Sequence, residues 1–443
     1  MTMKVYKAFI GCCLAGALGA PLQAIGGEKI VKLSLSEAIS MARENNYTLK
    51  AARSRVEQAE ARVVQSRQSY LPKVTFSETF LVTNDPGAAL VFKLQQKTLV
   101  DSDFMAAKMT NPDLINDFNT SLQVMQPIFN ADASAGRKMA VTAKKASEYM
   151  AMRTEEGIAL QVSKVYYGLI LAAKNIEAVD QSIRTMQGHS NDAAKAYRAG
   201  ILTKSDKLST EVRLSELQEQ KLMLQDEIRN ATDALKVMLR LDGAVSIVPT
   251  GELSVESVLP GGESATVSEN RADLKALETW RDVALNQEEM VKASRLPRLN
   301  AFAQSNLHSA TVLNGGSSWT VGLNMQWNIY DGMATAGRIQ EARAQEQEAM
   351  YGYEAAKSGS MAEAEKALRS LKTARTRIAG AQKSLEEARV SLDFIGEQFR
   401  TGMAMTFELL MREQAYTYSK MRLNQAKYDY CVARSELSFY RGN

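Results

Sequence analysis

The sequence of 443 residues predicts a mainly α-helical chain with a small β part, in which long helical hairpins follow pairs of β-strands. Three observations predict this fold class. The chain repeats one order of motifs, proline-free stretches have the apolar spacing of packed helices, and one stretch alternates strictly between apolar and polar residues. Each half of the chain is therefore expected to contain both strands and helices.

The internal repeat is visible in motifs that recur in the same order. Three pairs match: "ENNYTLKAARS" at 44–54 with "ENRADLKALET" at 269–279, "IFNADASAGRK" at 128–138 with "IYDGMATAGRI" at 329–339, and "YRAG" at 197–200 with "FRTG" at 399–402. Because three matches in order are improbable by chance, we interpret the chain as two structural repeats, 34–241 and 268–443. Residues 249–268 are rich in Pro, Gly and Ser and are expected to form a linker or belt region.

Long helices are predicted where prolines are missing, because proline breaks helix interiors. None of the eight prolines lies in 128–248 or 298–443. The first helix is expected to begin with a capping box at "SLSE", residues 34–37. Gly200 and Gly402 mark the tips of two long hairpins. Apolar residues step by four and three along these stretches, which is the heptad spacing of helices packed side by side: Ile158, Val162, Val165, Leu169, Ala172, Ile176, Val179, Ile183 and Met186, then Leu371, Ala374, Ile378, Ala381, Leu385, Ala388, Leu392 and Ile395.

The stretch "WTVGLNMQWNIY", residues 319–330, has the period-two alternation of a β-strand with one apolar face. Trp319 and Trp327 bracket that face, and eight residues of a tilted strand span roughly 20 Å. Aromatic residues flanking an apolar band are typical of membrane strands, and we expect Phe118, Trp319, Trp327 and Tyr330 to form such a girdle. Each half is expected to supply a strand pair: 72–83 with 117–129, and 298–309 with 318–330.

Four strands are too few to close a membrane barrel, for which about eight is the lower limit. A sheet cannot leave its edges open in lipid, so several chains must combine their strands. Glu78 falls on the apolar parity of its strand, which counts against that strand. Residues 84–116 form a long connection that could cover a pore or lie on the surface, and the surface loop is favoured.

The first 24 residues have the features of a secretory signal peptide, with Lys4 and Lys7 before an apolar run and a small residue at Ala24. The apolar run before Cys12 is too short to favour lipidation. Removal of residues 1–24 leaves Cys431 as the one cysteine, so no intrachain disulfide is expected.

Composition argues against several function classes. The formal net charge is +4 and no basic tract occurs, so nucleic acid is not an expected partner. His189 and His308 lie in different kinds of element, so no metal site is expected. Neither a phosphate-binding loop nor a nucleophile motif occurs, and we expect no cofactor and no enzymatic activity.

A Leu-Pro pair, Leu71-Pro72 or Leu296-Pro297, precedes the first strand of each half. The duplicated order of helix, Leu-Pro, strand pair, "PIFN" or "NIYDG" exit, long hairpin and "YRAG" or "FRTG" tip resembles the TolC-type outer-membrane efflux family. The resemblance covers essentially the whole chain after the signal peptide. It implies a homotrimer in which three chains form a twelve-stranded barrel in the outer membrane. The helices would continue that barrel through the periplasm as a coiled-coil barrel.

The resemblance also implies a function and partners. The chain would be the passive exit duct of a tripartite efflux or type I secretion system, with a gate at the periplasmic helical tips. A periplasmic adaptor (membrane fusion) protein and an inner-membrane pump would dock at the tips, around Tyr197, Gly200, Phe399 and Gly402. The alternative, based on the heptads alone, is a secreted or periplasmic coiled-coil scaffold without a pore.

Two acids are candidates for the gate. Asp206 and Glu408 each lie six residues after a tip glycine. The resemblance places both acids near the narrow end of the tunnel, where three copies would attract cations and raise the pKa of one another by repulsion. Asp206 also completes a capping box with Thr203, so helix capping alone explains it equally well.

The closed state is expected to differ from that of the family. Phe399 and Ala404 stand where family members that lock this end use a tyrosine and an arginine, and Met411 stands in place of a second acid. Phe399 has no hydroxyl to bond an acid, and Ala404 has no charge. The sequence therefore predicts a gate at Phe399, Asp206 and Glu408 that packing holds closed more than polar contacts do.

Overall fold

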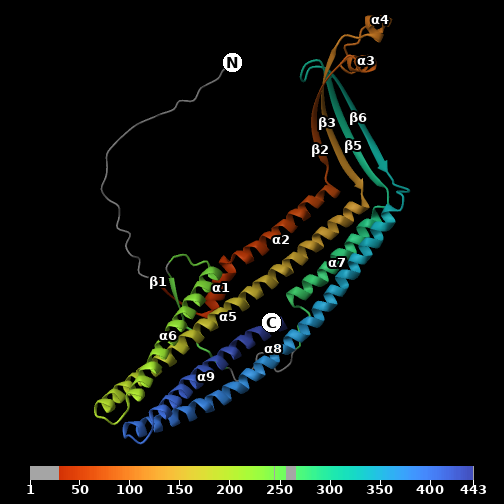
Figure 1. Ribbon diagram of the computed structural model, residues 1–443. Coiled ribbons are helices and arrows are strands. Elements are labelled where there is room, and N and C mark those ends of the chain that lie inside the picture. The colour runs from red at the N-terminus through yellow and green to blue at the C-terminus, as the bar shows by residue number, and fades with distance from the viewer. Residues whose placement is uncertain (1–28, 244, 256–265, 443) are drawn as a thin grey trace, which may run out of the picture.

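The computed structural model describes residues 29–243, 245–255 and 266–442. The molecule is elongated: the strands lie at one end, two hairpin tips lie at the other, and long helices connect them (Figure 1). This arrangement confirms the predicted class, mainly helical with a small β part. The expected signal peptide, 1–24, lies outside the described residues.

Two long helical hairpins form the body of the molecule. The first consists of α5 (Ala131–Arg198) and α6 (Lys204–Leu239), and the second of α8 (Ala334–Arg400) and α9 (Thr406–Arg441). Three shorter helices pack beside α5 and α8: α1 (Leu35–Asn45), α2 (Tyr47–Gln65) and α7 (Ala272–Ala293). At 1.5 Å per residue the 68 residues of α5 extend for about 100 Å.

The predicted heptad spacing marks the buried side of these helices. Val162, Leu169 and Val179 of α5 are almost fully buried, as are Leu371 and Ala374 of α8. They lie in two continuous clusters that join the hairpins along much of their length. Packing of this apolar stripe, more than intrinsic helix propensity, holds such long helices in place.

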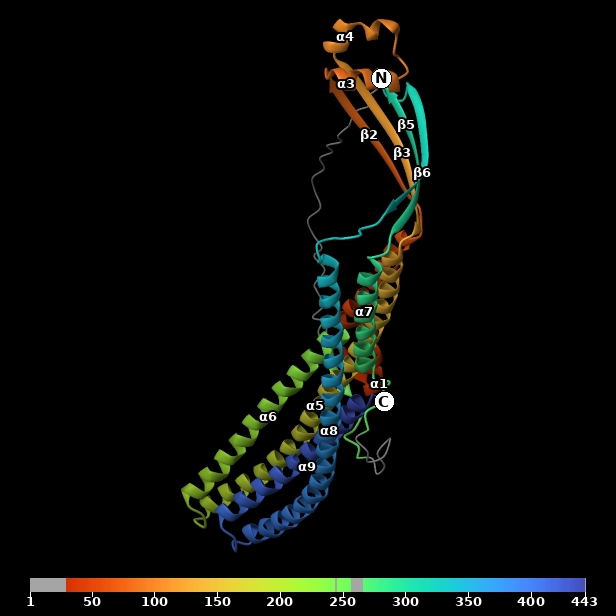
Figure 2. The same ribbon diagram turned by 90° about the vertical axis from the view of Figure 1, so that its right-hand side faces the viewer.

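A four-stranded antiparallel sheet stands above the helices (Figure 2), in the order β2 (Lys73–Thr83), β3 (Ile115–Phe129), β5 (Arg298–Ser309) and β6 (Gly316–Gln326). The pairing of β3 with β5 joins the two halves into one sheet. β2 and β6 are its edges, and among the described residues each has no strand partner on its outer side.

The last strand is shorter than predicted. The sequence pattern continues to 330, whereas β6 ends at Gln326. Gln326 pairs with Arg298, the first residue of β5, which follows Pro297. Proline has no N–H to donate to a ladder, so β6 has no further partner in β5. Residues 327–330 therefore keep their alternation but leave the sheet.

Part of the expected linker is packed. β4 (Val245–Pro249) pairs in parallel with β1 (Lys29–Leu33), a small sheet that the sequence pattern did not predict. Beyond it, Gly251 N donates to the Tyr166 hydroxyl at 3.1 Å, and Leu253 is buried in the main core. Residues 256–265 of the linker lie outside the described part.

The connection between β2 and β3 folds into short helices above the sheet: α3 (Pro86–Gln95), the 3₁₀ helix η2 (Asp101–Phe104) and α4 (Ala106–Thr110). Figure 2 shows α3 lying across the ends of the strands, with α4 beyond it. Among the described helices, none combines the length and the apolarity that a transmembrane helix needs.

Candidate functional site: a membrane sheet and two hairpin tips

The register of the sheet shows that the strands share one apolar face. Trp319 of β6 stands opposite Ser305, Ser305 opposite Leu122, and Leu122 opposite Phe76. Side chains alternate between faces along a strand, so the whole face follows from these rows. Its apolar members are Val74, Phe76, Phe80 and Val82 of β2, Phe118, Leu122 and Val124 of β3, Leu299, Ala301, Ala303 and Leu307 of β5, and Trp319, Val321, Leu323 and Met325 of β6.

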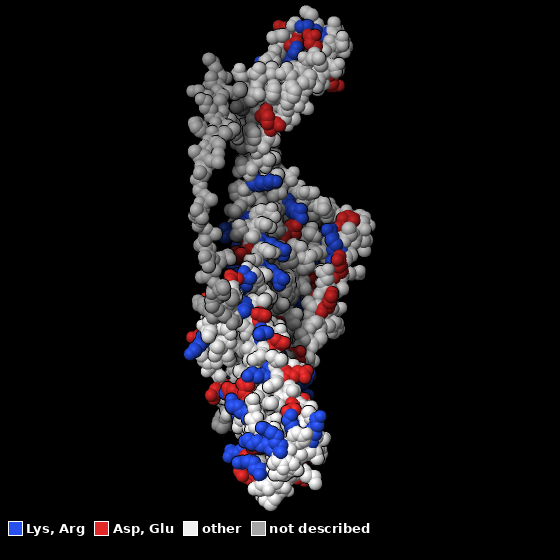
Figure 3. Space-filling model, turned by 60° about the vertical axis from the view of Figure 1, so that its left-hand side comes forward, with Lys and Arg blue, Asp and Glu red and all other residues white. Residues whose placement is uncertain are grey.

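This apolar face is open to its surroundings. Trp319 is 78 % exposed and Leu323 is 70 % exposed, as are large parts of Val74 and Phe76. Figure 3 shows one side of the molecule. Lys, Arg, Asp and Glu gather there over the helices and at the end that carries α3 and α4, while the sheet between these regions has few of them. A large exposed apolar patch on a sheet with few charges is suited to contact with lipid.

The opposite face of the sheet is mostly polar. Its residues include Thr75, Ser77, Thr79, Asn119, Ser121, Gln123, Asn300, Gln304, Asn306, Thr320 and Asn324. Phe302 is an exception, and Gly322 provides space for it: a Cβ at Gly322 would lie 2.9 Å from the Phe302 ring. Glu78 lies on the apolar face, opposite Thr120, as the sequence pattern indicated.

The expected girdle residues lie at the two ends of the strands. Phe118 and Trp319 lie near the outer end, and the rings of Phe118 and Phe80 are 4.6 Å apart. Trp327 follows the inner end of β6, where its Nε1 donates to the Arg295 carbonyl oxygen at 2.9 Å. Tyr330 lies beyond the strand and is largely exposed.

Both hairpin tips turn through a glycine, as predicted. Gly200 has φ 76° and Gly402 has φ 79°, in the left-handed region where side chains are disfavoured. Ile201 N donates to Ala196 O at 2.9 Å, and Met403 N donates to Gln398 O at 2.8 Å. These bonds close the last turns of α5 and α8 in the manner of a Schellman motif.

The two candidate gate acids differ in their surroundings. Asp206 forms the capping box of α6, in which Thr203 N donates to its carboxylate at 3.2 Å. The Thr203 hydroxyl lowers the pKa of Asp206, and the Thr406 hydroxyl at the start of α9 adds a smaller effect. Within one chain the pKa of Asp206 is therefore lowered, whereas repulsion between three copies was expected to raise it. Glu408 lies in the first turn of α9 and is exposed.

Phe399 lies between the hairpins. It is buried, and its ring packs edge-to-face on His189 of α5, with centroids 6.2 Å apart. Ala193 of α5 and Leu409 of α9 belong to the same cluster. Within the chain Phe399 is therefore a packing residue, whereas Tyr197 is partly exposed at the tip.

A buried polar network above the tips was not predicted. Arg213 Nε of α6 donates to Glu413 Oε2 of α9 at 2.8 Å. The other Glu413 oxygen accepts from the Thr417 hydroxyl at 2.6 Å, and Thr417 hydrogen-bonds Ser182 of α5 at 2.5 Å. The sequence did hold one sign of this network: Glu413, a charged residue, lies four residues after Leu409 and so on the same inward side of α9.

This network affects the charge state of its arginine. Burial alone would lower the pKa of Arg213, but the hydrogen bond and the charge of Glu413 outweigh burial and raise it. Arg213 therefore remains charged, and its network joins three helices of two hairpins. Breaking such a pair leaves one charge buried without its partner.

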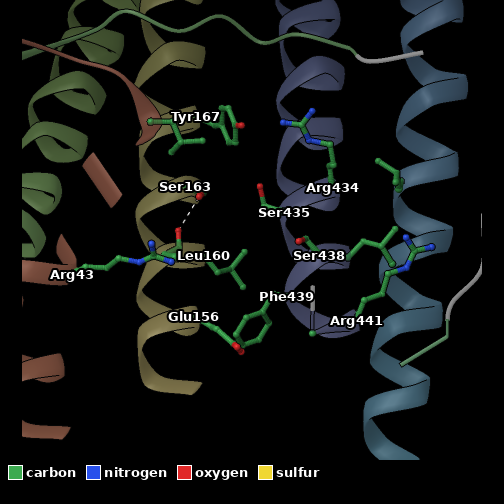
Figure 4. Close-up of a pocket in the computed structure, with 15 residues that line it drawn as sticks. Arg43, Glu156, Leu160, Ser163, Tyr167, Arg434, Ser435, Ser438, Phe439 and Arg441 are labelled. Atoms are coloured by element: carbon green, nitrogen blue, oxygen red, sulfur yellow. Dashed lines mark hydrogen bonds between the residues drawn. The ribbon is translucent and has the colours of Figure 1, made fainter. Parts of the chain in front are cut away.

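A cavity of about 490 Å³ lies between α5 and α9, nearer the middle of the molecule (Figure 4). Its polar groups already have partners: Glu156 pairs with Arg153 at 2.8 Å, and the Ser163 hydroxyl donates to Ala159 O at 2.8 Å. Within the described ranges, no three His, Cys, Asp or Glu residues are grouped as metal ligands. The sheet thus presents one apolar face and one polar face, and the hairpins present two tips.

These features define a class of outer-membrane protein with periplasmic helices. The chain belongs to the outer membrane efflux protein family, whose model matches residues 38–239 and 265–443. Membership identifies it as an outer-membrane efflux or secretion channel that extends into the periplasm, rather than a coiled-coil scaffold.

Individual relatives agree with this assignment. The alkaline protease secretion protein AprF of Pseudomonas aeruginosa is 25 % identical over 342 residues, covering 74 % of this chain and 70 % of the relative. The proteases secretion protein PrtF of Dickeya chrysanthemi is 20 % identical, covering 94 % and 90 %. The CmeC outer membrane channel of Campylobacter jejuni has a similar fold, with a TM-score of 0.78 at 18 % identity, covering 92 % and 85 %.

Proposed function

We propose that three copies of this chain form a passive exit duct through the outer membrane, with a gate at the hairpin tips. The open edges of the four-stranded sheet support the assembly, because β2 and β6 present unpaired backbone groups beside an apolar face. Pairing β6 of one copy with β2 of the next satisfies these groups. Three copies then give a closed barrel of twelve strands.

The polar face of the sheet lines the duct in this assembly. With the face of Trp319 and Leu323 in lipid, the face of Asn324 and Thr320 encloses water. The helices continue from the same sheet (Figure 1), and in the trimer they are proposed to extend the duct into the periplasm. Asp206 and Glu408 are proposed to narrow its end, held by the packing around Phe399.

The tips are proposed to dock a periplasmic adaptor protein, which connects the duct to an inner-membrane pump. Of the four predicted docking residues, Tyr197, Gly200 and Gly402 are exposed and available for that contact, whereas Phe399 is buried. The names of AprF and PrtF refer to protease secretion, which supports a polypeptide as cargo. Loss of a secreted protein from the medium on deletion of the gene, with unchanged drug susceptibility, would distinguish polypeptide from drug export.

Fractionation and channel recording test the duct. The full chain is expected in the outer-membrane pellet until detergent is added, and the extracted protein should be a trimer by light scattering. A detergent-independent monomer would exclude the barrel.

The gate is tested in the same trimers by single-channel selectivity. Glu408→Gln should lower the preference for cations, because it removes three charges from the narrow end, and Asp206→Asn should have a smaller effect. Asp226→Asn, which changes an exposed acid far from the α6 tip, is the matched control. Unchanged selectivity of the Glu408 variant would remove that acid from the pore.

A further inference from the structure

The connection between β2 and β3 is anchored on one particular face of the sheet. The end of α3 passes directly over Gly316, the first residue of β6. A Cβ at Gly316 would lie 2.1 Å from Gln95 O and 2.9 Å from Lys97 Cγ. Only glycine leaves space for the backbone to approach so closely.

Buried hydrogen bonds fix the same contact. Gln96 Nε2 donates to Asp117 Oδ1 at 2.9 Å and to the Asn116 carbonyl oxygen at 2.8 Å. The second Asp117 oxygen is 2.7 Å from His308 Nδ1 of β5. Gln96, Asp117 and His308 are all buried, so the contact excludes water and each polar group depends on the others.

The register assigns this anchor to the polar face. Asp117 precedes Phe118, which lies on the apolar face, and side chains alternate along the strand. His308 pairs with Gly316, whereas Ser305 pairs with Trp319. The anchor therefore lies on the side that faces the lumen in the proposed barrel, which favours the pore-covering alternative over the surface loop expected from the sequence.

The connection is a folded unit whose exterior carries apolar side chains beside charged ones. Asp103 is buried and accepts from Lys93 Nζ at 2.6 Å and from Val100 N at 3.1 Å, which ties η2 to α3. Large apolar side chains nevertheless remain exposed on it: Val91, Leu94, Val100, Phe104, Met105, Met109 and Leu114. In a single copy these apolar side chains are exposed to water, which is unfavourable.

We propose that residues 86–114 form a lid on the lumen side of the outer mouth, and that the lids of three copies meet through these apolar side chains and narrow the exit. The occupant of the apolar surface is thus the same segment of a second copy. The contact between lids of neighbouring copies would continue the interface that the open edges of β2 and β6 require. The proposal rests on the trimeric duct proposed above.

Conductance of the full-length trimer in planar bilayers tests the lid. All trimers compared, the reference included, carry Glu413→Ala, which breaks the Arg213 pair and loosens the tips so that the outer mouth is the narrowest section. Gly316→Val should then displace the end of α3 and raise single-channel conductance about twofold or more, since conductance follows the narrowest pore section. Ser317→Val is the matched control, because it adds a similar side chain to the next residue on the opposite, exposed face. It should conduct as the reference trimer does.

A second variant replaces residues 87–113 with a short Gly-Ser linker, so the test does not depend on the folding of the Gly316 variant. These trimers should reach at least the conductance of Gly316→Val trimers. Trimers that lack the lid yet conduct like the reference trimer would overturn the lid while leaving the duct intact. Absence of any channel from the unaltered protein would overturn the duct and the lid together.

Phe104→Cys in a Cys431→Ser background tests the contact between copies. Oxidation should produce disulfide-linked dimers within the trimer, whereas Leu323→Cys in lipid should give none. Absence of Phe104 cross-links in a trimer whose conductance depends on the lid would place another partner on this surface and overturn the contact between copies.

Discussion

Arg213 of the first hairpin and Glu413 of the second form a buried ion pair, with Nε and Oε2 2.8 Å apart and the Glu413 side chain only 1 % exposed. Because the two residues come from different hairpins, this pair resists their separation. Arg213 also pairs with Glu216 of its own helix at 3.0 Å, but Glu216 is 55 % exposed. The same arginine thus makes one buried and one solvent-exposed ion pair.

Glu413→Ala should loosen the hairpins strongly, because removal of one partner of a buried pair costs about 3–5 kcal/mol. Glu216→Ala is the matched control and should cost less than about 1 kcal/mol, since its pair is exposed. Thermal unfolding of the detergent-extracted protein and proteolysis of the tips measure the difference. Equal stability of the two variants would show that the Glu413 pair does not hold the hairpins together.

Arginine substitutions should distinguish the two faces of β6. Leu323→Arg should impair assembly by about 2–4 kcal/mol because it places a charge in lipid, whereas Asn324→Arg should be tolerated on the opposite face. Leu323 pairs with Ala301 and Asn324 with Asn300, so both positions lie in the same part of the sheet. The yield of trimer in the outer membrane is the measurement, and equal yields would exclude lipid contact.

Gly402 should tolerate asparagine better than valine. Nothing lies within 4 Å of a Cβ built at this glycine, so the expected penalty comes from its φ of 79° alone. A branched side chain is strained there by about 1–2 kcal/mol, and asparagine less. Gly402→Val should therefore reduce export and adaptor cross-linking more than Gly402→Asn, with both proteins still in the membrane. Normal export by the valine variant would argue against a docking role for this tip.

Acidification should weaken the packing at the tips through His189. Burial is the main cause that lowers the pKa of His189, and Arg400 adds to it, while Asp192 and Glu413 oppose it. The imidazole is therefore neutral when folded and takes up a proton more readily when unfolded. Its contribution to stability is complete above the unfolded pKa of about 6.5 and is lost as pH falls through the lower folded value.

Protease cleavage at the tips should thus increase between about pH 7.5 and pH 5.5, the interval around the unfolded pKa. His189→Leu keeps an apolar contact with Phe399 and should reduce this pH dependence. An unchanged pH dependence in that variant would assign the effect to other groups.

The sequence by itself determined the features that depend on local chain geometry. Heptad spacing identified the buried stripe that includes Val162 and Leu371, and the capping box located the start of α1 at Ser34. The tip glycines and the apolar parity of Trp319 and Leu323 also followed from residues near one another in the chain. Each of these signals spans only a few residues, because helix and strand periods are fixed by the backbone.

Tertiary structure alone decided which distant segments meet. The pairing of β3 with β5, the end of β6 at Gln326 and the contact of Arg213 with Glu413 each join residues far apart in the chain. The anchor of the connection between β2 and β3 depends on Asp117 and His308, which are 191 positions apart. Local periodicity fixes the faces that an element presents, but packing in three dimensions selects the face that each one meets, and so only the folded chain shows that the outer connection is anchored on the polar side of the sheet.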